Sequence, residues 1–159
     1  MKTFISIYLL LTLLISCNID STNTHPESKN KFEVEEIKDS LKAIIQIVLN
    51  NSETLNVDKA FAPFLKDSTF FFITNTERFN YNDLKKNEGD YFSMLKKQHF
   101  DFPFQHFNVI DKNNAVATLI GTITSTLKND QIIKNKIAET ILFRRVNNIW
   151  KIVGGHESL

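Results

Sequence analysis

Two residues near the end of the chain could form an acid and base pair. Glu139 lies in the stretch 132–146 and His156 in the stretch 149–157, and both stretches alternate apolar and polar residues. Histidine titrates near neutral pH, and a carboxylate beside it can orient the imidazole. Glu139 and His156 are therefore the candidate catalytic residues, provided that the chain places them face to face on an apolar wall.

A hairpin would bring the two residues together. Asn147 and Asn148 separate the two stretches and predict a two-residue turn, because asparagine tolerates the positive φ of tight hairpins. Counting outward from this turn gives the expected cross-strand pairs: Val146 with Ile149, Arg145 with Trp150, Phe143 with Ile152, Ile141 with Gly154, and Glu139 with His156.

Charge decides which face of this hairpin points inward. The opposite face pairs Arg144 with Lys151, and two facing cations belong in solvent. We therefore expect the face with Trp150 to point inward, together with Glu139 and His156. A slip of one residue would turn both side chains to water. Alternatively, His156 is a structural histidine bonded to Glu139 or to the backbone.

The sequence carries no motif for metal binding, phosphate binding or a serine nucleophile. The His, Asp and Glu residues show no zinc or calcium spacing, and the chain has no glycine-rich phosphate loop and no Gly-x-Ser-x-Gly motif. We therefore predict neither a metal nor a cofactor. Apolar residues predicted to line a ligand pocket are Tyr91, Phe72, Phe104, Ile120 and Ile141. For the phenylalanines, the alternative is a role as ordinary core residues.

Helices dominate the first half of the predicted domain. Ile37, Leu41 and Ile45 recur at the spacing of one helical face and predict a long amphipathic helix over 32–49. A short helix is expected over 57–65, a buried strand over 68–74, and a third helix from Asn82 or Asp83 to about residue 97.

An antiparallel meander follows, with strands expected near 100–110, 115–127, 132–146 and 149–157. Phe100, Phe102 and Phe104 alternate with polar residues or Pro103, whereas Phe107 has the opposite parity. A bulge near Gln105 would reconcile the two halves, and Pro103 indicates an edge strand.

Composition limits the possible partners. The 159 residues contain 19 Lys and Arg against 18 Asp and Glu, so the formal net charge is +1 and no nucleic-acid partner is indicated. The apolar fraction of 42%, with 14 Phe, is enough for one globular core.

The N-terminus resembles the signal of a bacterial lipoprotein. Lys2 precedes an apolar run from Phe4 to Ile15, which is too short to span a membrane, and Leu14-Ile15-Ser16-Cys17 follows the pattern of a lipobox. The resemblance implies that Cys17, the single cysteine, is lipidated and becomes the mature N-terminus. The alternative is an ordinary secretory signal with an incidental cysteine.

This interpretation divides the chain into a signal peptide (1–16), a lipidated cysteine with a flexible polar tether (17–30), and one domain (31–159). Asn18 stands where an Asp would resemble an inner-membrane retention signal. We therefore expect an acyl anchor in the bacterial outer membrane, with the domain facing the periplasm.

The order of elements and the final hairpin resemble SnoaL-like domains of the nuclear transport factor 2-like superfamily. The hairpin supplies the sequence pattern: Phe143-Arg144, a tight turn, Trp150-Lys151-Ile152, and an ending of His156-Glu157-Ser158. The resemblance implies an α+β fold of the cystatin-like class, in which a curved antiparallel sheet wraps around N-terminal helices and forms a conical pocket. It also implies a homodimer that forms through the sheet.

Three functions stay open on the sequence alone. The first is a lipid-anchored module that binds a small apolar molecule or a peptide. The second is a pocket enzyme that transfers protons, as an isomerase, cyclase or dehydratase, with His156 and Glu139. The third is a dimerising assembly module. Members of the superfamily include all of these types, so the fold does not choose among them.

Overall fold

The structure is a computed structural model, and it describes residues 26–159. The predicted signal peptide and Cys17 lie outside the described residues. The described chain folds into three helices and six strands: α1 (Pro26–Glu53), α2 (Val57–Ala60), β1 (Phe71–Thr74), β2 (Glu77–Phe79), α3 (Tyr81–Met94), β3 (Leu95–Val109), β4 (Asn114–Leu127), β5 (Ile132–Val146) and β6 (Ile149–Ser158).

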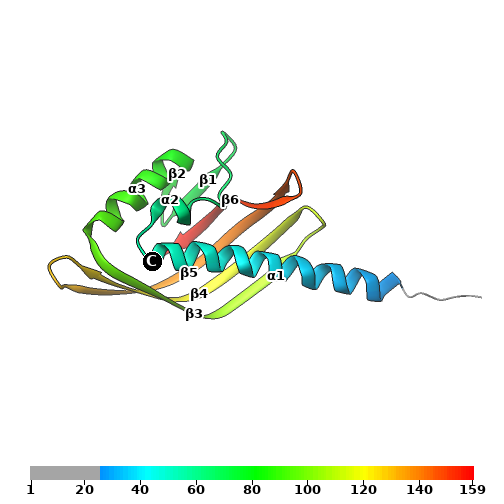
Figure 1. The fold of residues 1–159 in the computed structure, drawn as a ribbon, viewed down its shortest axis with the longest axis horizontal. Helices are drawn as coiled ribbons and strands as arrows, with labels where there is room; N and C mark the ends of the chain where they lie inside the picture. The colour runs from blue at the N-terminus through cyan, green and yellow to red at the C-terminus, as the bar shows by residue number, and fades with distance from the viewer. Residues whose placement is uncertain (1–25) are drawn as a thin grey trace, which may run out of the picture.

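The six strands form one open, curved sheet in the order β2-β1-β6-β5-β4-β3 (Figure 1). Strands β3 to β6 form the predicted antiparallel meander. The sheet is mixed rather than purely antiparallel, because β1 pairs with β6 in parallel. Strand β3 is an edge strand, as Pro103 predicts.

The helices cover one face of this sheet. Helix α1 runs across the strands, and α2 and α3 lie beside its C-terminal end, next to β1 and β2 (Figure 1). The predicted apolar stripe of α1 is confirmed, because Ile37, Leu41 and Ile45 are all buried and Leu41 is 0% exposed. Helix α1 begins at Pro26, so the predicted tether from that residue onward is helical.

Capping residues set the limits of the shorter helices. The Asn80 side chain accepts a hydrogen bond from the Asp83 backbone N–H, so α3 begins at Tyr81. Asn56 caps α2 through the Lys59 N–H, and α2 ends at Ala60, well before the predicted limit of residue 65. A cluster of aromatic rings continues from there: Phe61, Phe64, Phe70 and Tyr81.

Turn residues behave as their types predict. Asn147 and Asn148 have φ values of 50° and 63°, which are the positive values that a two-residue hairpin requires. The expected pairs close to this turn are confirmed, from Val146 opposite Ile149 to Phe143 opposite Ile152. Trp150 is 8% exposed and belongs to the core, so the predicted inward face is also confirmed here.

A bulge in β3 changes which of the later residues of this strand face inward. In β3 the register shifts between Asp101 and Phe104, slightly before the expected position near Gln105. Gly121 of β4 lies against this bulge, and a Cβ at Gly121 would stand 1.9 Å from the Asp101 carbonyl oxygen. Glycine is therefore required for the close approach of the two strands.

None of the described helices has both the length and the apolar character that a membrane span needs.

Candidate functional site

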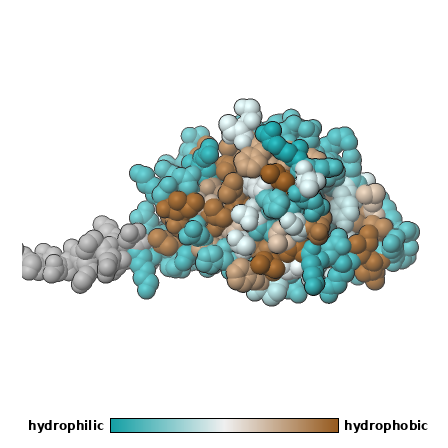
Figure 2. Space-filling view, turned by 180° about the vertical axis from the view of Figure 1, so that it is seen from behind, coloured by the Kyte–Doolittle hydropathy of each residue, from teal (hydrophilic) through white to brown (hydrophobic). Residues whose placement is uncertain are grey.

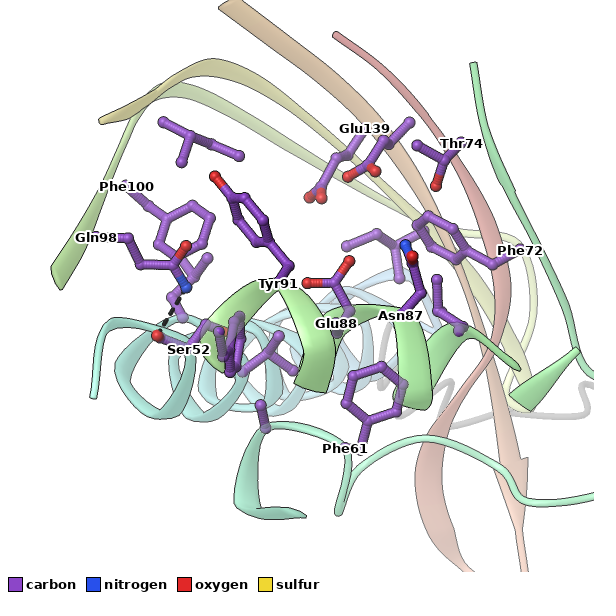
Figure 3. A pocket seen from close by; sticks show the side chains of 18 of the residues that line it. Ser52, Phe61, Phe72, Thr74, Asn87, Glu88, Tyr91, Gln98, Phe100 and Glu139 are labelled. Atoms are coloured by element: carbon purple, nitrogen blue, oxygen red, sulfur yellow. Dashed lines mark hydrogen bonds between the residues drawn. The ribbon is translucent and has the colours of Figure 1, made fainter. Parts of the chain in front are cut away.

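A pocket of about 410 Å³ lies between α1, α3 and the covered face of the sheet. Most of its lining is apolar and aromatic, and Figure 3 shows several of these side chains around the open space. A volume of this size suits a small organic molecule. The lining includes three of the predicted ligand-binding residues: Phe72, Tyr91 and Ile141.

The other two predicted ligand-binding residues lie on the opposite face of the sheet, and their assignment to the pocket is wrong. Phe104 is 50% exposed and its partner Ile120 is 48% exposed. The bulge in β3 causes the difference, because it inserts an extra residue and reverses the parity of the strand. Phe102 takes the inward place and is 9% exposed.

The outer face holds a shallow groove that includes Phe104 and Ile120. Exposed large apolar residues of the described chain are Ile47, Met94, Phe104, Ile110, Ile120, Ile132, Ile149 and Leu159. Figure 2, seen from behind the view of Figure 1, shows separate apolar patches interrupted by polar residues.

The predicted pairing of Glu139 with His156 is wrong. Val153 forms a bulge in β6, because Phe143 pairs with Ile152 whereas Leu142 pairs with Gly154. Beyond the bulge every partner is displaced by one residue, so Glu139 faces Glu157 and His156 pairs with Thr140. His156 is exposed and is absent from the pocket lining.

Three glutamates from three different elements line the pocket: Glu88 of α3, Glu139 of β5 and Glu157 of β6. Figure 3 shows the Glu88 carboxyl group rising from α3 toward the sheet, and the Glu139 carboxyl group reaching into the same space. Sequence reasoning identified only Glu139 as a site residue.

Burial raises the pKa of each of these carboxyl groups. Loss of solvation, and then the negative charge of Glu157, raises the pKa of Glu139 to about 8. The same two causes raise the pKa of Glu88 to about 7. Loss of solvation also raises the pKa of Glu157, although hydrogen bonding with Thr74 and with Glu139 opposes part of that rise. The pair therefore favours a protonated Glu139 that donates to an ionised Glu157.

Polar contacts fix the opposite end of the pocket. Tyr91 donates from its hydroxyl group to Ser125 Oγ over 2.9 Å, and Gln98 Nε2 donates to the Ser52 carbonyl oxygen over 2.7 Å. Glu53 Oε1 accepts from the Phe100 backbone N–H and lies 2.8 Å from His99 Nδ1. The contacts of Ser52 and Glu53 join the end of α1 to β3, and the Tyr91 contact joins α3 to β4, so this end of the pocket is fixed.

The charged residues of the pocket lining are all acidic. Among the residues that the structure describes, no Lys, Arg or His lines the pocket. A fourth acidic residue of the lining, Asp90, is exposed and pairs with Lys86, which lies outside the lining. Within the described chain, the lining therefore provides no cation to the three glutamates. Nor does any group of described His, Cys, Asp and Glu side chains have the arrangement of a metal site. The site can accept hydrogen bonds from a ligand and, where a glutamate is protonated, donate one.

Part of this site could have been found in the sequence. Leu84, Glu88 and Tyr91 recur at helical spacing, which places Glu88 on the same face of α3 as two residues that contact the interior. Glu157 gave no such signal, because its inward position depends on the bulge at Val153.

Comparison with known proteins identifies the type of domain. The sequence of residues 41–159 matches the SnoaL-like domain family. No curated protein matches the chain in sequence.

Solved structures show the fold. A nuclear transport factor 2-like superfamily protein from Salmonella enterica serovar Typhimurium has a TM-score of 0.72 at 18% identity, over 79% of this chain and 92% of that chain. A Novosphingobium aromaticivorans protein proposed to be a scytalone dehydratase has a TM-score of 0.73 at 6% identity, over 80% and 86%. An uncharacterised protein with a cystatin-like fold from Caulobacter vibrioides has a TM-score of 0.65 at 12% identity, over 76% and 87%. The predicted α+β, cystatin-like fold is confirmed.

Proposed function

The chain belongs to the SnoaL-like domain family, and we propose that its domain is a binding module that holds a small, mostly apolar molecule in the pocket between α1, α3 and the sheet. The observation behind the proposal is the pocket itself. It has a volume of about 410 Å³, its lining is mostly apolar, and a small group of carboxyl side chains lies at one end. Binding pockets for small molecules usually combine a large apolar surface with few polar groups that fix orientation.

The apolar wall would provide most of the affinity. Phe72 of β1, Phe100 of β3 and Ile123 of β4 approach the space from different strands. Each square ångström of apolar ligand surface removed from water contributes about 25 cal/mol before the entropy of association is subtracted. The glutamates would then orient a polar group of the ligand.

The proposal includes a location. The lipobox pattern at Leu14-Ile15-Ser16-Cys17 supports attachment of the domain to the bacterial outer membrane through acyl chains on Cys17, with the pocket in the periplasm. Several acyl chains anchor a protein far more firmly than one.

A neutral fluorescent probe tests binding in the pocket. N-phenyl-1-naphthylamine becomes fluorescent in apolar surroundings, and we expect it to bind the domain at one saturable site. Ile123→Trp should fill the pocket and weaken probe binding at least tenfold. The matched control is Ile120→Trp, which changes the same residue type on the same strand but on the outer face.

The two variants separate the outcomes. Loss of binding in Ile123→Trp and unchanged binding in Ile120→Trp would support the proposal, provided that both variants retain cooperative unfolding. The reverse result would place the site in the outer groove. No saturable binding to the unaltered protein would contradict the proposal.

A second candidate function is proton transfer on the bound molecule. The specific observation in its favour is the Glu139–Glu157 pair, because a carboxylic acid and a carboxylate that share a proton near neutral pH can act as acid and base. In this version Glu139 and Glu157 have the roles that the sequence suggested for Glu139 and His156.

A further inference from the structure

We propose that the pocket selects an organic amine: a molecule with an apolar, aromatic-sized body and a protonated amino group that lies among Glu88, Glu139 and Glu157. The inference rests on the proposed function, since it assumes that the pocket binds a small apolar molecule, and it names the chemical class of that molecule.

The charge of the lining is the first support. Elements α1, β3 and β4 present only uncharged residues to the pocket, while α3, β5 and β6 present acidic ones. The two lysines on α3 are already paired, Lys85 with Asp58 over 2.6 Å and Lys86 with Asp90 over 2.5 Å. Within the described residues, the positive charge that would balance the three glutamates is missing from the pocket.

The arrangement of the carboxyl groups is the second support. Glu139 and Glu157 face each other across β5 and β6. Glu88 approaches the same space from α3, on the opposite side of the pocket from the sheet (Figure 3). A primary ammonium group has three N–H donors that point in different directions. Three carboxyl groups from three elements can each accept one of these donors, whereas a ligand carbonyl could accept only from those glutamates that are protonated.

The state of Glu88 is the third support. It lines the pocket, and no hydrogen bond or ion pair joins its carboxyl group to a side chain of the described residues. A carboxylate in apolar surroundings without a partner is costly. A bound ammonium group would provide that partner and would lower the pKa of the nearby glutamates, so binding at pH 7 should release protons.

The aromatic wall is suited to the rest of such a ligand. Phe72, Tyr91 and Phe100 come from β1, α3 and β3, and surround the apolar part of the pocket. Aromatic faces also attract an organic cation by about 0.5 to 2 kcal/mol. An amine without an apolar body would lose the contacts with this wall.

Three matched probes test the inference: 4-phenylbutylamine, 4-phenylbutan-1-ol and 4-phenylbutanoate, titrated calorimetrically into the protein at pH 7. We expect the amine to bind at least tenfold more tightly than the alcohol, and the carboxylate to bind most weakly. Titrations in buffers of different ionisation enthalpy should show that binding of the amine releases protons from the glutamates, whereas binding of the alcohol releases none.

Variants locate the interaction. Glu88→Gln and Glu139→Gln should each lower the affinity for the amine about tenfold while the affinity for the alcohol stays constant, which also shows that the pocket remains folded. Glu36→Gln is the matched control, because Glu36 is exposed on α1 and lies outside the pocket lining. It should leave both affinities unchanged.

The outcomes distinguish the inference from the proposed function. If the alcohol binds as tightly as the amine, the selection of amines is wrong and the apolar binding module stands. If the carboxylate binds most tightly, the selection is also wrong. If none of the three probes binds and N-phenyl-1-naphthylamine does not bind either, both proposals fail. If that dye binds in the pocket but no probe does, only the inference fails.

Discussion

Glu139 of β5 and Glu157 of β6 are direct cross-strand partners, and both side chains line the same pocket. Like charges in this position are unfavourable unless the two groups share a proton. Burial, and then the negative charge of Glu157, raises the pKa of Glu139. A single bulged residue, Val153, creates the relationship, because it replaces His156 by Glu157 on the inward face.

The first prediction concerns pH. The pKa values of Glu139 and Glu88 are raised from 4.5 to about 8 and about 7, so between pH 4.5 and 8 the folded protein binds more protons than the unfolded chain. The free energy of unfolding should therefore fall as the pH rises through this window. Urea denaturation at several pH values measures this decrease in the free energy of unfolding.

The glutamine variant of Glu139 gives the corresponding control. Glu139→Gln removes an ionisable group from the pocket, and it should flatten this part of the pH profile. At pH 8 it should be more stable than the unaltered protein by about 1 to 3 kcal/mol. A variant that loses stability at pH 8, with an unchanged slope, would contradict the assignment of Glu139 as the main titrating group.

The second prediction concerns the core of the final hairpin. Trp150 is buried beside the turn and belongs to the hydrophobic core. Trp150→Ala should lower the free energy of unfolding by about 3 to 5 kcal/mol, because it removes a large buried ring and leaves a cavity. A loss of less than about 1 kcal/mol in chemical denaturation would show that the ring is not packed as described.

The third prediction compares two glycines. At Gly155 a Cβ would lie 2.6 Å from the Phe72 ring and 2.7 Å from the Thr140 carbonyl oxygen, so Gly155→Ala should destabilise the domain by about 1 to 3 kcal/mol. At Gly89 of α3 a Cβ would meet only Val57, at 3.8 Å. Gly89→Ala should stabilise the helix by about 0.5 to 1 kcal/mol.

Thermal unfolding of the two alanine variants side by side measures this contrast. Gly155→Ala should also weaken binding of the neutral probe, because Phe72 would have to move away from the pocket wall. Equal melting temperatures for both variants would mean that β1 does not pack against β6 as closely as described.

The fourth prediction concerns the anchor. Acylation requires the Cys17 thiol, so Cys17→Ser should transfer the protein from the membrane fraction to the soluble fraction of bacterial cells, or leave it unprocessed. Cell fractionation and the mass of the mature N-terminus measure this. If the Cys17→Ser variant is processed and is retained in the membrane as fully as the unaltered protein, the lipoprotein assignment is wrong.

Sequence patterns predicted the elements well where the signal is local. The stripe of Ile37, Leu41 and Ile45 located α1, and the Asn147-Asn148 turn located the final hairpin with its first four pairs. The parallel pairing of β1 with β6 was not predicted, because it joins segments that lie far apart in the chain and no local pattern encodes it.

The pocket was only partly predictable for the same reason. Parity identified Ile141 as an inward residue of the final hairpin but placed Phe104 and His156 on the wrong face, because each of these two lies beyond a bulge. A bulge costs little and leaves no clear trace in the sequence, yet it reverses every later position in the strand. Residues close to a turn are therefore predicted more securely than residues distant from it.

The most direct test is a carboxyl-carbon NMR titration of the natural protein with labelled glutamate. Two glutamates should titrate far above the usual range, one near pH 8 and one near pH 7, and the first signal should be missing in Glu139→Gln. In Glu157→Gln the highest midpoint should fall, because the charge that raises it is gone. If every glutamate titrates near pH 4.5, no buried carboxyl cluster exists and the account of the pocket is wrong.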